Sequence, residues 1–72
     1  MEKIYKPKAR KLWDTGKSFI AVSHKFSPHS VFAFTIDPTL AGVPFDEWYN
    51  AFCYYNCNMY ETGYYPAFYI PA

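Results

Sequence analysis

Aromatic residues crowd this chain, and their number constrains what the chain can fold into. The 72 residues include seven phenylalanines, two tryptophans and eight tyrosines. A chain of this length has room for one small core, and each aromatic side chain buries a large area when it packs. A disordered segment carries few aromatic residues. We therefore expect residues 1–72 to form a single small folded domain.

The pattern along the chain predicts an α+β fold. The segments 18–25, 30–37 and 64–70 are rich in β-branched and aromatic residues and lie between turn-forming residues, which predicts strands. A further strand over 8–13, ahead of the turn at 14–17, rests on the weakest pattern. Pro44 and the acidic residues after it mark the start of a helix that runs to Tyr55 or Asn56. The order β-β-β-α-β predicts a small antiparallel sheet with one amphipathic helix packed on one face.

The expected helix has a clear apolar stripe. At about 100° per residue, one side of the helix, within about 120°, carries five aromatic residues. These residues are Phe45, Trp48, Tyr49, Phe52 and Tyr55. We expect Trp48 and Phe52 to pack against the sheet, whereas Tyr54 points to the opposite side.

The strands then divide into two faces, because side chains alternate along a strand. We expect Ile20 and Val22 to meet the helix. The opposite face would be a shallow, partly apolar platform of small residues and aromatic rings. Its members would be Phe19, Ala21, Ala33, Tyr65, Ala67 and Tyr69. The alternative is that the N-terminal segment covers this face. Pro66 predicts that the last strand lies at an edge or is bulged.

The charges are divided unevenly along the chain. Six of the seven basic residues lie within residues 1–17, and no lysine or arginine follows Lys25. We therefore expect residues 1–10 to form a basic, flexible N-terminal arm. Interface cores are depleted in lysine and enriched in aromatic residues. The second half of the chain has this composition.

The leading functional hypothesis is a non-enzymatic protein-binding module that docks on a larger protein and acts by occlusion. Inhibitors encoded by phages and mobile elements, such as anti-CRISPR proteins, have this size and composition. Tyrosines outside the helix stripe are the expected contacts, since tyrosine is favoured in interfaces. They are Tyr54, Tyr60, Tyr64, Tyr65 and Tyr69. A homodimer could use the same surface.

The alternative hypothesis is a nucleic-acid-binding protein. The basic arm would contact phosphates, and exposed aromatic rings would stack on bases. The basic residues concerned are Lys6, Lys8, Arg10 and Lys11. The acidic character of the aromatic half makes this the second choice.

Other classes find no support in the sequence. No catalytic motif or cofactor-binding motif is present. Cys53 and Cys57, with His24 and His29, could supply four zinc ligands, but the C-x3-C spacing on a helix differs from the usual C-x2-C knuckle. We expect free thiols and no metal. No apolar run approaches the ~20 residues of a membrane span, and no secretory signal opens the chain. A cytoplasmic location is therefore expected.

Overall fold

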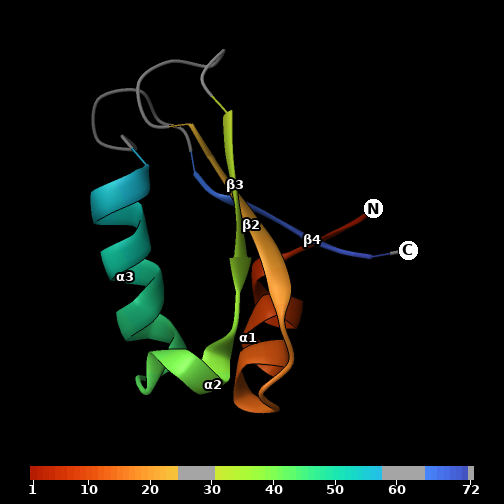
Figure 1. The fold of residues 1–72 in the computed structure, drawn as a ribbon, viewed down its shortest axis with the longest axis vertical. Helices are drawn as coiled ribbons and strands as arrows, with labels where there is room; N and C mark the ends of the chain where they lie inside the picture. The colour runs from red at the N-terminus through yellow and green to blue at the C-terminus, as the bar shows by residue number, and fades with distance from the viewer. Residues whose placement is uncertain (25–30, 58–64, 72) are drawn as a thin grey trace.

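The computed structural model describes residues 1–24, 31–57 and 65–71 (Figure 1). It confirms an α+β fold, with one four-stranded antiparallel sheet and helices. The elements in chain order are β1 (Glu2–Ile4), α1 (Lys6–Asp14), β2 (Phe19–His24), β3 (Val31–Ile36), α2 (Pro38–Ala41), α3 (Phe45–Asn56) and β4 (Ala67–Ile70).

The strands lie in the order β1-β4-β2-β3, and each pairs antiparallel with its neighbours. The strands expected over 18–25 and 30–37 are confirmed as β2 and β3, with slightly shorter bounds. The expectation that the last strand lies at an edge or is bulged is wrong, because β4 lies inside the sheet, between β1 and β2. Pro66 precedes the first paired residue, Ala67, so its missing N–H removes no bond from the ladder.

The prediction of a strand over residues 8–13 is also wrong, since these residues belong to helix α1. Pro7 stands in the first helical turn, where a missing N–H is tolerated. Ala9 and Trp13, four residues apart, are both buried and form the inner side of the helix. Gly16 ends the helix with a φ of 72°, and its N–H donates to the Trp13 carbonyl over 3.1 Å. The expected turn is therefore present, but it joins a helix to a strand.

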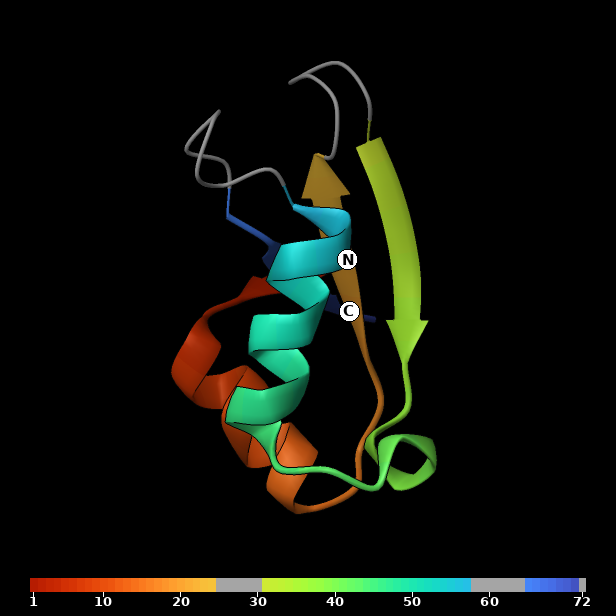
Figure 2. The ribbon, with the colours of Figure 1, turned by 90° about the vertical axis from the view of Figure 1, so that its left-hand side faces the viewer.

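Helices α1 and α3 lie side by side (Figure 2). The rings of Trp13 and Trp48 stack with their centroids 5.0 Å apart. The Trp13 indole N–H donates to the backbone carbonyl of Val43 over 2.9 Å, just before α3 begins. Because the buried side of α1 meets α3 and the same core, the N-terminal segment covers the helix side of the sheet.

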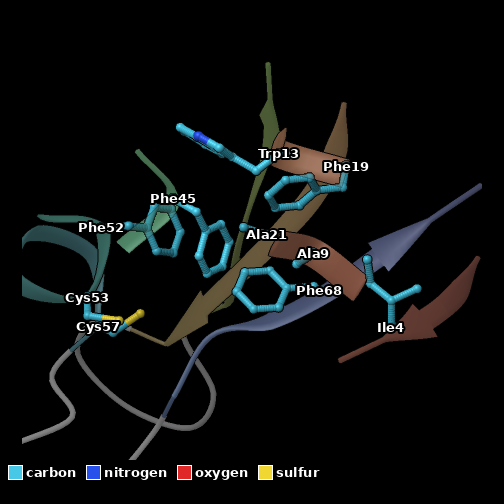
Figure 3. Packing of buried hydrophobic residues seen from close by; sticks show 10 residues of the cluster. All are labelled: Ile4, Ala9, Trp13, Phe19, Ala21, Phe45, Phe52, Cys53, Cys57 and Phe68. Carbon is cyan, nitrogen blue, oxygen red and sulfur yellow. The ribbon is translucent and has the colours of Figure 1, made fainter. Parts of the chain in front are cut away.

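Helix α3 packs on the sheet through most of its expected stripe. Trp48 packs edge to face on Phe19 of β2, with the ring centroids 5.7 Å apart. Phe52 packs in the same way on Phe34 of β3, with the centroids 5.5 Å apart. The expected positions of Trp48 and Phe52 are thus confirmed. Tyr55 departs from the prediction, because its side chain is 65% exposed. The helix is turned so that the small thiol side chains Cys53 and Cys57 are buried instead (Figure 3).

The face of β2 that meets the helices is the opposite one from the prediction. Phe19 and Ala21 face the helices, and both are almost fully buried (Figure 3). Ala21 lies opposite Phe34 on one side and Phe68 on the other. A methyl group between two phenylalanine rings leaves these rings room to pack against α3. Ile20 is therefore on the opposite face.

Candidate functional site

The sheet face opposite the helices carries an unusual set of side chains. We call it the open face, and it consists of Lys3, Ile20, Val22, Val31, Ala33, Thr35, Ala67 and Tyr69. The assignment follows from strand alternation, because Phe19, Ala21 and Phe68, which alternate with these residues, belong to the core. In Figure 1, the β2–β3 pair is seen nearly edge-on with α3 on one side. None of the described helices covers the open face.

The open face is apolar across its middle. Tyr69 lies between Lys3 and Ile20 in the strand register. Val22 lies between Ala67 and Ala33 in the next row. An antiparallel sheet that exposes one face to water normally places polar side chains there. Among the described side chains of the open face, Lys3, on the edge strand, is the one that carries a charge.

This surface agrees in part with the platform expected from sequence. Ala33, Ala67 and Tyr69 lie on it, as expected. Phe19 and Ala21 do not, because they belong to the core. The alternative in which the N-terminal segment covers this face is wrong, since β1 joins the sheet and α1 packs beside α3.

The candidate tyrosines do not gather at one place. Tyr54 is 75% exposed on α3, and Tyr65 is 61% exposed ahead of β4. Tyr69 is half-buried and lies on the other side of the sheet from α3. Tyr60 and Tyr64 lie outside the described residues. Sequence reasoning missed the exposed ring of Tyr5, because the strand β1 before it was not anticipated.

A hollow of about 290 Å³ beside the β1–β4 pair brings basic and aromatic side chains together. Tyr5, Tyr49 and Tyr65 line it, together with Lys6. The Lys6 ammonium lies 3.9 Å from the centre of the Tyr49 ring, a cation–π contact. Burial raises the pKa of Tyr49 to about 12, so this phenol stays neutral at physiological pH.

The basic residues of the N-terminal segment differ in their surroundings. The Arg10 guanidinium donates two hydrogen bonds to the Asp46 carboxylate, at 2.8 and 3.0 Å, and joins α1 to α3. These hydrogen bonds raise the pKa of Arg10 and lower that of Asp46. Lys8, Lys11 and Lys17 border a separate shallow hollow beside α1. Arg10 and Lys6 thus take part in packing, whereas Lys8 and Lys11 point to solvent as exposed side chains.

The two cysteines are free thiols within the core. Their sulfur atoms lie next to each other at one margin of the cluster (Figure 3). Burial raises the pKa of both, that of Cys57 to about 12. Both thiols are therefore protonated at neutral pH, a form that neither attacks electrophiles nor binds metals well. Within residues 1–24, 31–57 and 65–71, no group of three potential metal ligands is found. His29 lies outside these residues, so the absence of metal stays a prediction.

Comparison with known proteins gives no relative. No family model, curated protein or solved structure matches this chain. Among the described helices, none is long and apolar enough to cross a membrane.

Proposed function

We propose that this chain is a non-enzymatic protein-binding module that docks on a larger protein through the open face of its sheet. The observation that carries the proposal is an apolar sheet face whose described side chains include a single charged one, Lys3, at the margin. Val31 and Ala33 are exposed on this face, and Ile20, Val22, Ala67 and Tyr69 are partly exposed. An apolar face of this kind on a small domain marks an interaction site. Occlusion of a partner's functional surface is the mode of action proposed for it, as for small inhibitors of phages and mobile elements, anti-CRISPR proteins included.

The chemistry of the open face suits a protein partner. Tyr69, at its centre, supplies a large ring with a hydroxyl group and few torsions to immobilise. The flat aliphatic neighbours Ile20 and Val22 can pack against a partner without desolvating charge. Two small residues, Ala33 and Ala67, flank Val22 and let a partner side chain approach the strands closely.

Affinity capture from cells of the native host, with variants of the bait, tests this proposal. The bait variants Tyr69→Ala and Ala67→Glu change the open face, whereas Tyr54→Ala changes an exposed tyrosine on α3. We expect the wild type and Tyr54→Ala to retain the same protein and the two open-face variants to lose it. Circular dichroism confirms that each bait is folded. Equal retention by all four baits, or loss with Tyr54→Ala alone, would contradict the proposal.

A second candidate function, nucleic-acid binding, is favoured by the hollow that holds Tyr5, Lys6 and Tyr65. Two exposed rings there could stack on bases while Lys6 meets a phosphate. Against it, Lys8 and Lys11 border a different hollow, beside α1, from the one that holds the two rings. A salt titration separates the two functions. A nucleic-acid complex weakens steeply with salt through counterion release, and an apolar protein complex weakens little.

A further inference from the structure

The two edges of the sheet differ in how well they are protected. The edge strand β1 has three residues and carries two charges, Glu2 and Lys3. The other edge strand, β3, has six residues, Val-Phe-Ala-Phe-Thr-Ile, with neither charge nor proline. Natural proteins guard edges with short strands, charges or proline, because an unpaired edge recruits other strands. Strand β3 has none of these devices.

The side chains of β3 are exposed as well. Val31 is 56% exposed on the open face, and Phe32 is 43% exposed on the helix side. Phe34, two residues further, is half-buried because Phe52 of α3 covers it. No described strand lies beyond β3. The free edge therefore presents unpaired backbone groups with apolar side chains on both faces.

We propose that β3 pairs antiparallel with β3 of a second copy of this chain, about a two-fold axis at Ala33. Cross-strand neighbours in a sheet lie on the same face, so a two-fold pairing must centre on a residue and not between two. An axis at Ala33 satisfies this rule. It sets Phe32 opposite Phe34 of the second copy and Val31 opposite Thr35 of the second copy.

The sequence of the edge argues for a second copy rather than a foreign strand. Residues 31–35 read Val-Phe-Ala-Phe-Thr, nearly the same in both directions, because valine and threonine have the same shape. The pairing therefore yields aromatic and β-branched cross-strand pairs on both sides of the axis, which are favourable combinations. No charge within β3 opposes the approach of an identical strand.

The pairing would complete the aromatic layer at the place where it ends. The exposed ring of Phe32 would meet Phe34 of the second copy, which already packs on Phe52 there. The four-stranded sheet would continue across the axis, with the helices of both copies on one side. The open faces would join into one surface on the other side, so this inference neither requires the proposed function nor conflicts with it.

Sedimentation velocity across a concentration series tests the pairing with the purified chain alone. The variant Ala33→Glu sets two glutamates opposite each other at the axis, while Ala33 is exposed in the single copy. The control Ala51→Glu adds the same charge to an exposed position of α3. In a series that reaches a protein concentration of about 500 µM, we expect the wild type and Ala51→Glu to form dimers whose fraction rises with concentration. Ala33→Glu should raise the dimer Kd by about tenfold or more.

Charge complementation tests the register in which the two β3 strands pair. Ala33→Lys alone should also weaken the dimer, and an equimolar mixture of Ala33→Glu and Ala33→Lys should restore it, because unlike charges then meet at the axis. A wild-type chain that stays monomeric throughout the series overturns the proposal. So does a dimer that Ala33→Glu leaves intact, or a mixture that fails to recover the association that each single variant has lost.

Discussion

The two faces of this sheet are built from similar residues and have different surroundings. The inner face presents Phe19, Ala21 and Phe68 to the helices, and all three are almost fully buried. The open face presents Ile20 and Val22 from the same strand β2, and no described helix lies over them. Apolar residues thus occupy both sides of β2, but only one side contributes to a described core.

The difference indicates which apolar residues stabilise the fold. Trp48 lies within about 6 Å of Trp13, Phe19, Phe45, Phe52 and Phe68, measured between ring centroids. Such aromatic pairs add to the free energy gained from burial. The open face has no comparable cluster among the described residues. Its apolar side chains therefore lie outside the described aromatic core.

The largest expected effect comes from the inner face. Phe52→Ala should lower the free energy of unfolding by about 3–5 kcal/mol, because a buried ring that packs on Phe34 and Trp48 is lost. Tyr55→Ala, one turn later, is the matched control and should change it by less than about 0.5 kcal/mol. Urea unfolding monitored by circular dichroism measures both. Equal losses in the two variants would show that α3 is turned differently.

The second effect concerns binding through the open face. Once the partner has been captured, Tyr69→Ala should weaken its binding by about 2 kcal/mol or more, as at a hot spot. The free energy of unfolding should fall by less than about 1 kcal/mol, since Tyr69 lies outside the aromatic cluster. Calorimetric titration and urea unfolding give the two values. If Tyr69→Ala binds the partner normally but has a much lower free energy of unfolding, Tyr69 stabilises the fold and does not contact the partner.

The third effect is a loss of stability at alkaline pH. The pKa of Cys57 is raised to about 12 in the folded chain, from an ordinary value of 9.0. Between these values the folded state binds more protons than the unfolded state, so stability is complete below about pH 9 and falls as pH rises toward 12. Tyr49, with its pKa raised to about 12 from 10.0, acts in the same direction.

Thermal unfolding under reducing conditions measures this dependence. The Tm of the wild type should fall between about pH 8 and about pH 10.5, and that of Cys57→Ala should fall less over the same interval. A wild-type Tm that is constant across this range would contradict the burial of the thiol.

The smallest effect comes from a charge added to the open face. Thr35→Lys should leave the free energy of unfolding within about 0.5 kcal/mol of the wild type, because Thr35 is exposed. The matched change Ala21→Lys, on the inner face, should prevent folding, since it buries an unpaired ammonium group. Urea unfolding in dilute solution compares them. A strongly destabilised Thr35→Lys would mean that the open face is covered within one copy.

The sequence predicts part of this fold for clear physical reasons. Helix α3 was predictable because Pro44, two acidic residues and an aromatic stripe agree on its start and its buried side. Strands β2 and β3 were predictable from their β-branched and aromatic content. Helix α1 was misjudged, although Pro7 in the first turn and the spacing of Ala9 and Trp13 are helical signals.

The faces of β2 could not be predicted, because Phe19 and Ala21 alternate with Ile20 and Val22 and both sets are apolar. The choice depends on the register, which sets small Ala21 between two phenylalanine rings of neighbouring strands. The candidate site shares this limit. Tyr69 was predictable because it lies outside the helix stripe and tyrosine is favoured in interfaces. Ile20 and Val22 beside it were expected to meet the helix instead.

Alanine methyl NMR with a soluble paramagnetic agent tests the central claim most directly. Ala9 and Ala21 are fully buried among the helices, while Ala33 and Ala67 lie on the open face. In the free protein the agent should broaden the methyl signals of Ala33 and Ala67 and leave those of Ala9 and Ala21 sharp. Addition of the captured partner should protect Ala33 and Ala67. If these two methyls are already protected in the free monomer, or stay broadened when the partner is bound, the open face is not the binding surface.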